Sequence, residues 1–152
     1  MQTLARLIIL PVIAVVLSMT PAQSADLDRT DPAAVAVAFL NAFKAKDVIA
    51  MAPLSNETNR EMFTSLAAEG EAHKAYNDVF SGWRFDSAVA WDGTVQPTRY
   101  KENGEAVVAF HQMPDDEVAV IVLTKENGIW GIEDINSPSN DQLMSLSTTP
   151  PQ

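Results

Sequence analysis

The fold is decided by residues 83–135, which read WRFDSAVAWDGTVQPTRYKENGEAVVAFHQMPDDEVAVIVLTKENGIWGIEDI. Three dipeptides in this stretch lie between apolar runs, namely Asp92-Gly93, Asn103-Gly104 and Asn127-Gly128. A two-residue type I′ hairpin turn needs positive φ at both central residues, which Gly adopts freely and Asn and Asp tolerate. The stretch therefore predicts five strands joined in an antiparallel meander, the first of them from Trp83 to Trp91.

The lengths of the turns predict which residues share a face of this sheet. With two-residue loops at the three Gly turns and a four-residue loop at 113–116, Arg99, Val108, Ile121 and Asp134 form one cross-strand row. The face of that row holds Ala106, Val108, Phe110, Ala119, Ile121, Leu123, Trp130 and Ile132. The other face holds Thr98, Tyr100, Val107, Ala109, His111, Val118, Val120, Val122, Glu133 and Ile135. Both faces are largely apolar, and the first is suited to packing under helices.

The residues before this stretch have helical patterns. Thr30 or Asp31 is suited to cap a helix with Pro32 in its first turn, and its apolar stripe consists of Ala36, Phe39, Leu40 and Phe43. Asp47 predicts a cap for a short turn over 48–52, which Pro53 ends. Residues 61–79 predict two helical pieces divided at Gly70, with Ser81-Gly82 leading into the sheet. The fold class is α+β, with N-terminal helices packed on one face of a curved antiparallel meander.

Composition narrows the classes of partner. The chain has 152 residues, a formal net charge of −10 and no Cys. The length suits one domain, and the absence of Cys excludes disulfides, thiolate catalysis and Cys-based zinc sites. Because Lys and Arg are scattered singly, we expect no nucleic-acid partner.

Residues 1–25 are typical of a secretory signal peptide. Arg6 precedes an apolar run from Leu7 to Leu17, and small residues up to Ala25 suit cleavage. A membrane anchor is the alternative, but the run is short of the roughly 20 residues that span a bilayer. We expect a periplasmic or secreted protein without stable membrane insertion after cleavage. It would consist of a leader at 26–30, one domain at 31–135 and a polar, partly disordered tail at 136–152.

Two segments resemble a known superfamily. FLNAFKAKD at 39–47 and KENGIWGIEDI at 125–135, with the order of elements between them, resemble the nuclear transport factor 2-like proteins. This superfamily includes the ketosteroid isomerase-like and polyketide cyclase-like proteins and many small exported bacterial proteins. The resemblance covers residues 31–135 and implies a cone-shaped fold with a cavity between helices and sheet. Its enzymes place a general base and hydrogen-bond donors there, but no matching set of Tyr, Asp and Asp aligns in this chain.

Several side chains are candidates for chemistry. His111 and Asp134 are candidate general bases, and Tyr100 or a Trp is the candidate donor. The alternatives are a hydrogen-bonded strand histidine and an ion pair of Asp134 with Arg99. An apolar ligand would be lined by Phe39, Phe43, Tyr100, Phe110 and Trp130, which are otherwise core residues. The spacing of His73 and His111 fits no metal motif, and the acidic turn at 115–117 lacks the Gly of a calcium loop, so we expect neither metal nor cofactor.

The second sheet face predicts an interface. Helices on one side alone would leave Val107, Val118, Val120 and Val122 in water, which favours a homodimer or an envelope protein partner. Alternatively, the strand at 83–91 or the C-terminal tail, through Leu143, Met144 and Leu146, covers this face. Three functions stay open: a non-catalytic module that binds an apolar ligand or a protein, a cofactor-independent isomerase or cyclase-type enzyme, and a subunit of an envelope assembly.

Overall fold

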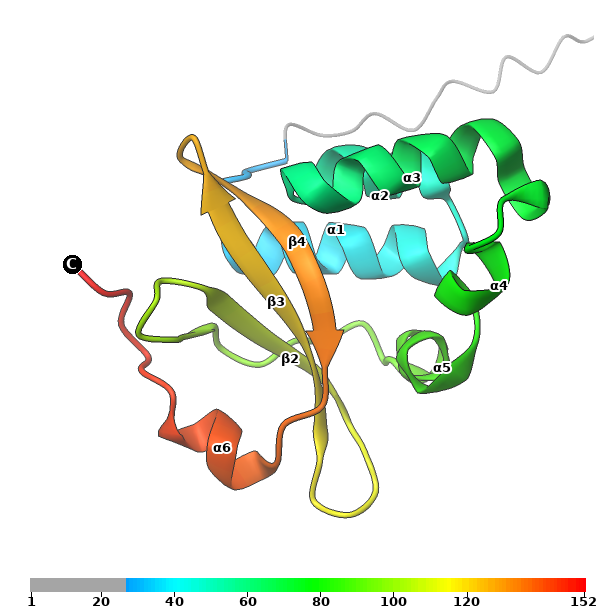
Figure 1. Ribbon diagram of the computed structural model, residues 1–152. Coiled ribbons are helices and arrows are strands. Elements are labelled where there is room, and N and C mark those ends of the chain that lie inside the picture. Colours follow the sequence, from blue (N-terminus) through cyan, green and yellow to red (C-terminus); the bar gives the residue numbers. More distant parts are fainter. Residues whose placement is uncertain (1–26) are drawn as a thin grey trace, which may run out of the picture.

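The computed structural model describes residues 27–152, so the predicted signal peptide lies outside the described residues. Helices come first in the chain and a four-stranded antiparallel sheet follows, in the order β1-β2-β3-β4. The helical elements are α1 (Pro32–Lys44), α2 (Val48–Leu54), α3 (Glu57–Glu69), η1 (Gly70–Ala72), α4 (Tyr76–Val79), α5 (Gly82–Ala90) and α6 (Asn140–Ser145). The strands are β1 (Arg99–Tyr100), β2 (Ala106–Gln112), β3 (Val118–Glu126) and β4 (Ile129–Asn136). The helices α1 to α5 lie on one side of the sheet and α6 lies on the other (Figure 1), which confirms the predicted α+β class.

The helix starts follow the predicted caps. The side chain of Asp31 accepts a hydrogen bond from the backbone N–H of Ala33, and the side chain of Asp47 accepts one from Ala50. Each bond satisfies an N–H that the first turn of a helix leaves without a partner. The predicted apolar stripe of α1 is buried, and α3 ends at Gly70, whose φ is +60°. Helix α2 differs from the prediction, because it passes through Pro53 and ends one residue later.

Residues 83–90 lie in a helix, so the predicted first strand from Trp83 to Trp91 is wrong. This helix is α5, whose Phe85 ring lies 5.3 Å from that of Phe43 and whose Ala88 is fully buried. Residues three apart share a face of a helix, so Phe85 and Ala88 can both face the core from α5. Asp92-Gly93 is therefore no hairpin turn. The Asp92 side chain instead accepts from the backbone N–H of Thr94, at 2.8 Å.

The three remaining loops follow the turn prediction to different extents. Asn127 and Gly128 have φ of 51° and 83° and join Glu126 to Ile129, which confirms the type I′ hairpin. At the preceding Gly turn only Gly104 has positive φ, and Tyr100 pairs with Ala106 rather than Val107. This slip by one residue turns Tyr100 to the helix side of the sheet and Arg99 to the other. The β2–β3 loop is one residue longer than predicted.

Two bulges also shift the register. Val107 pairs with Val122 and Val108 with Ile121 as predicted, but an irregularity follows between Ala109 and His111. Between β3 and β4 a second one shifts the partner of Ile121 from Asp134 to Ile135. A bulge places an extra residue on one strand and moves every later side chain. The predicted row from Arg99 to Asp134 is therefore wrong at both ends, and Ile135 joins the helix-side core.

The helix-side face is confirmed as the main core. All eight residues predicted for it are buried together with α1, α2 and α5. The opposite face holds a smaller core of Val107, Ala109, Val118, Val120 and Val122, covered by Leu143 of α6. Its four predicted interface valines are at most 3% exposed, so the premise that a single chain leaves them in water is wrong. The cover comes from the C-terminal segment, which was the alternative, although Met144 itself is 60% exposed.

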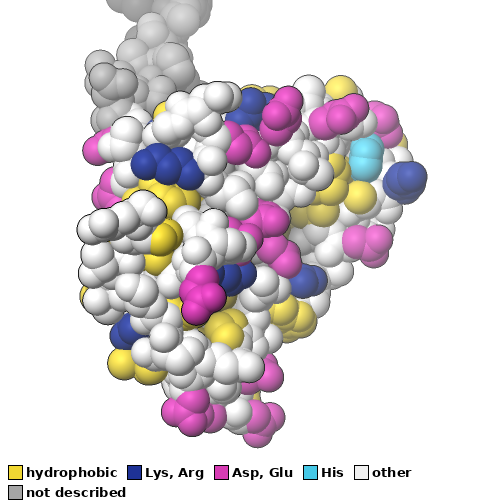
Figure 2. Space-filling view, turned by 60° about the vertical axis from the view of Figure 1, so that its left-hand side comes forward, with side chains coloured by type: hydrophobic (Ala, Val, Ile, Leu, Met, Phe, Trp, Pro, Cys, Tyr) yellow, Lys and Arg dark blue, Asp and Glu magenta, His cyan; other side chains and the backbone are white. Residues whose placement is uncertain are grey.

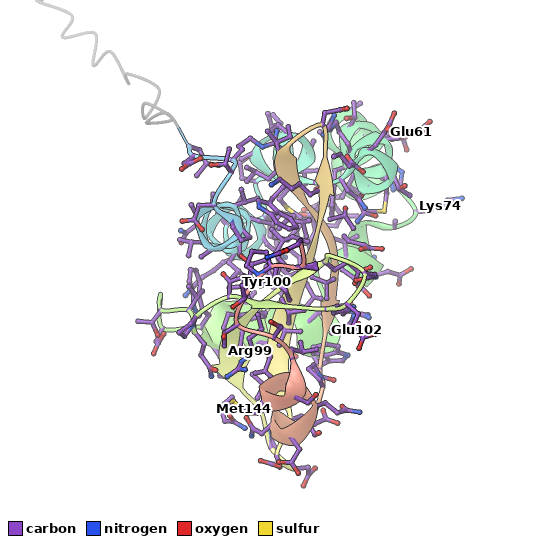
Figure 3. All side chains as sticks on the ribbon, turned by 90° about the vertical axis from the view of Figure 1, so that its left-hand side faces the viewer. Glu61, Lys74, Arg99, Tyr100, Glu102 and Met144 are labelled. Atoms are coloured by element: carbon purple, nitrogen blue, oxygen red, sulfur yellow. The ribbon has the colours of Figure 1, made fainter. Side chains whose placement is uncertain are left out.

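Arg99 and Tyr100 hold the C-terminal segment in place. The Arg99 guanidinium donates to the carbonyls of Met144 and Leu146, and Tyr100 exchanges two backbone hydrogen bonds with Ser147. Figure 3 shows Arg99 above α6, beside Met144. The chain after residue 135 therefore packs on the sheet at least as far as Ser147. Figure 2 shows the hydrophobic side chains of one side of the molecule in small separate patches between charged ones.

Candidate functional site

A pocket of about 350 Å³ opens between the helices α3, α4 and α5 and the outer strand β4. Its size lies at the lower end of the range usual for small-molecule sites. Eight apolar residues form most of its lining: Phe39, Phe43, Met62, Phe63, Ala75, Val79, Ile132 and Ile135. Polar groups come from Asn59, Asp78, Arg84, Glu133 and Asp134. An apolar lining with a few polar groups is typical of a ligand site.

The phenylalanines of the pocket belong to one aromatic cluster. The ring of Phe39 lies 5.9 Å from that of Phe43 and 6.1 Å from that of Phe63. Behind them Phe43 contacts Phe80 at 5.8 Å and Phe85 at 5.3 Å. Such distances are typical of favourable aromatic pairs. Phe39, Phe43, Phe63 and Phe80 are at most 7% exposed, so the pocket has a floor fixed by the core of the fold.

Arg84 is held at the rim by its own helix and by β4. Its Nε donates to the carbonyl of Ile135 at 2.8 Å, and its guanidinium lies 5.0 Å from the ring centroid of Trp83. The bond to Ile135 also satisfies a carbonyl of β4, which is an edge strand of the sheet that residues 27–152 form. The Nε atom of Arg84 is thereby fixed against β4, while the N–H groups of its Nη1 and Nη2 atoms remain at the rim of the pocket.

Asp134 lies beside Arg84 and not beside Arg99. The Asp134 Oδ1 atom is 3.9 Å from the Arg84 Nη2 atom, and the two side chains are 50% and 49% exposed. The predicted pair with Arg99 is wrong, because the bulge moves Asp134 and the register slip turns Arg99 toward α6. An exposed pair at this distance contributes at most about 1 kcal/mol. The pair therefore contributes little to the stability of the fold.

Glu133, next along the strand, has a raised pKa. Burial is the main cause, and repulsion from Glu105 and Asp134 adds to it, while Lys101 opposes the shift. Glu105 itself has a lowered pKa, chiefly because the Lys101 ammonium donates a hydrogen bond to it. The pocket end of β4 is thus an acidic environment in which Arg84 is the cation that lines the rim.

The candidate bases are not brought together. His111 lines a separate depression of about 410 Å³ with Ala90, Asp92 and Gln96. Phe110 borders that depression as well, although its side chain is buried in the core. Asp134 lines the other pocket, so the structure places the two candidate bases in different depressions.

The predicted ligand-binding residues are divided in the same way. Phe39 and Phe43 line the pocket between the helices and β4. Tyr100 instead lines a groove with the C-terminal residues 145–151, and Trp130 lies beside Pro150 and Pro151. The Trp130 Nε1 atom also donates to the carbonyl of Thr30, at 3.2 Å. These two aromatic residues therefore hold chain segments in place rather than line the pocket.

Sequence reasoning missed Arg84, Phe63 and Ala75 as pocket residues. Arg84 was missed because residues 83–91 were assigned to a strand. A signal was present in the helical spacing of Phe85 and Ala88, which places Arg84 on the neighbouring side of the same helix. Phe63 follows Met62 in a helix whose apolar residues are sparse, so its burial depends on the tertiary contact with Phe39.

Two further findings concern residues 27–152. In this part of the chain, no three His, Cys, Asp or Glu side chains lie close enough together to hold a metal ion. Nor does any helix there have the length and apolar character needed to cross a membrane.

No protein-family model matches the chain, and the comparisons with curated proteins and with solved structures find no match either.

Proposed function

We propose that this protein is a non-catalytic binding module that holds a small, predominantly apolar ligand in the pocket between α3, α4, α5 and β4. The observation that carries the proposal is the pocket itself, about 350 Å³ in volume, with Phe39 and Phe43 in its lining. A ligand that covers these side chains removes its own apolar surface from water, which contributes roughly 25 cal/mol for each Å² buried.

The position of the pocket also supports the nuclear transport factor 2-like assignment, which is part of this proposal. In that superfamily the cavity lies between the helices and the sheet, and here the pocket has the same neighbours. The apolar run and small residues of 1–25 support export, so we propose a periplasmic or secreted carrier. Likeness of fold alone does not specify the ligand.

The other two functions have less support. An enzyme would need its base and donors around one cavity, whereas Asp134, His111 and Tyr100 line three different depressions. An assembly subunit was expected to dock through the valine face, whose side chains are covered by α6. A homodimer or protein partner remains a prediction, without a surface that favours it.

The proposal can be tested with a substitution that fills the pocket. Ala75 lies in its wall, so Ala75→Phe would place a ring in the space of the ligand. The matched control is Ala90→Phe, at an exposed position that lines the depression near His111. We would purify the protein without denaturation, record its native mass spectrum and titrate the ¹⁵N-labelled protein with 2-methylnaphthalene while following amide NMR signals.

We expect the probe to shift amide signals of α3, α4 and β4, and expect Ala75→Phe to weaken its binding at least about tenfold. Ala90→Phe should bind the probe like the unmodified protein. A small molecule that stays bound in the native spectrum would identify the ligand class directly. Saturation at a site unaffected by Ala75→Phe, or no binding of any apolar probe, would overturn the proposal.

A further inference from the structure

Arg84 and Asp134 lie at a distance that suits a bridging atom. The 3.9 Å between the Arg84 Nη2 and Asp134 Oδ1 atoms exceeds a direct hydrogen bond, which for N–H···O is 2.7–3.2 Å. One oxygen placed about 2.8 Å from both atoms completes a triangle with an angle of about 90° at that oxygen. Such an oxygen accepts a hydrogen bond from the guanidinium and donates its own proton to the carboxylate.

Arg84 and Asp134 both have hydrogen-bonding positions left for a bridging oxygen atom. Within residues 27–152 the Nη1 and Nη2 groups of Arg84 have no hydrogen-bond acceptor, since only its Nε is used, by Ile135. Asp134 accepts one hydrogen bond, from the backbone N–H of Ile135, at the Oδ1 atom. A carboxylate has about four acceptor positions, so further bonds are available.

The arrangement favours an uncharged polar group over a charged one. A ligand carboxylate would face repulsion from Asp78, Glu133 and Asp134, and a ligand ammonium has no lone pair to accept a hydrogen bond from Arg84. A hydroxyl avoids both and satisfies both partners, because it is donor and acceptor in one atom. A ketone or ether oxygen satisfies Arg84 alone and leaves Asp134 without the additional bond.

We propose that Arg84 and Asp134 form a hydroxyl-reading pair, so that the pocket selects uncharged apolar alcohols or phenols. This inference rests on the proposed function, because the apolar body of the ligand must occupy the pocket for its hydroxyl to reach the rim. The phenylalanine floor supplies affinity for the body, and the pair supplies selectivity for the hydroxyl.

The experiment compares three probes of nearly equal shape. 2-Naphthol donates and accepts, 2-methoxynaphthalene accepts alone, and 2-methylnaphthalene does neither. Each is titrated by amide NMR into the unmodified protein, into Asp134→Ala and into the control Asp86→Ala. Asp86 is exposed on the same helix as Arg84 and does not line the pocket, so its removal changes the net charge equally.

For the unmodified protein and for Asp86→Ala we expect 2-naphthol to bind about tenfold more tightly than either other probe, the usual effect of a hydrogen bond to a charged group. Asp134→Ala should remove the advantage over 2-methoxynaphthalene and leave 2-methylnaphthalene binding unchanged. Arg84→Met serves as a second variant, which should lower the affinities of 2-naphthol and 2-methoxynaphthalene together.

The outcomes separate the two proposals. If the three probes bind equally in the pocket, the hydroxyl-reading pair is wrong while the binding module stands. If none of them binds, the proposed function has failed. A preference for 2-naphthol that persists in both Asp134→Ala and Arg84→Met would overturn the assignment to these residues.

Discussion

Gly131 lies where the junction between α2 and α3 meets β4. A Cβ atom at this position would lie 2.8 Å from both the Cα and the N atom of Asn56, and 3.0 Å from the backbone C of Ser55. This close approach lets the Asn56 N–H donate to the Ile132 carbonyl at 2.9 Å. Gly131 is therefore required for contact between backbones and not for a turn, since its φ is not in the left-handed region.

Replacing Gly131 by alanine should destabilise the protein. The contacting atoms are backbone atoms, so two chain segments must separate, and overpacking of this kind costs typically 1–3 kcal/mol. Urea unfolding at equilibrium measures the change. Gly128→Asn is the comparison, because nothing lies within 4 Å of that position and the substitution therefore reports the strain of a φ of +83° without overpacking. A Gly131→Ala protein as stable as the unmodified one would contradict this account of the junction.

At the scale of elements, α6 depends on the surface that it covers. Six residues are too few for a helix that is stable alone in water. Its start is reinforced by a capping box, in which the Ser139 side chain and the Gln142 side chain each bond to the other residue's backbone N–H. Its position is fixed by Leu143 on the valine core and by the bonds from Arg99.

Leu143→Ala should loosen this cover and expose the valine face. The side chain is 2% exposed, and leucine-to-alanine changes in cores typically cost about 2–5 kcal/mol. We expect a lower urea midpoint together with concentration-dependent self-association, measured by sedimentation velocity. The neighbouring Met144→Ala, at a position that is 60% exposed, should change stability by less than about 1 kcal/mol. Equal effects of the two substitutions would mean that α6 does not seal the sheet.

The strands show where counting along the sequence fails. Asn127-Gly128 fixes the pairing next to it, and this pairing holds from Ile129 to Ile132. Beyond Ile132 the bulge decides, and no local signal in the sequence indicated its position. A register predicted by counting is therefore reliable close to a tight turn. It becomes less reliable farther along the strand, because a single bulge changes the partner of every residue beyond it.

In the whole molecule, β3 lies at the centre of both cores. Its residues from Val118 to Leu123 are all buried, with helices on one side and α6 on the other. In contrast, η1 and α4 contain no buried residue. The two cores share this strand, so opening β3 requires the loss of both, whereas η1 and α4 can open alone.

Hydrogen exchange should show this difference directly. Opening free energies range from near zero in locally unfolding segments to the global value in core strands. We expect the amides of β3 to exchange last and those of residues 70–79 to exchange first, measured by mass spectrometry with peptide resolution. Protection of residues 70–79 equal to that of β3 would contradict a division into a stable sheet and a weakly held helical corner beside the pocket.

The sequence by itself determined the features that depend on a few neighbouring residues. These are the start of α1 near residues 30–31, the cap at Asp47, the buried stripe of α1, the break at Gly70, the Asn127-Gly128 turn and the helix-side face of the sheet. Only the tertiary structure decided that residues 83–90 form a helix, that β4 is bulged and that α6 covers the valines. It also placed Arg84 against Ile135, 51 positions later in the chain. Contacts between residues so far apart depend on the packing of the whole molecule, and the pocket rim is made of such contacts.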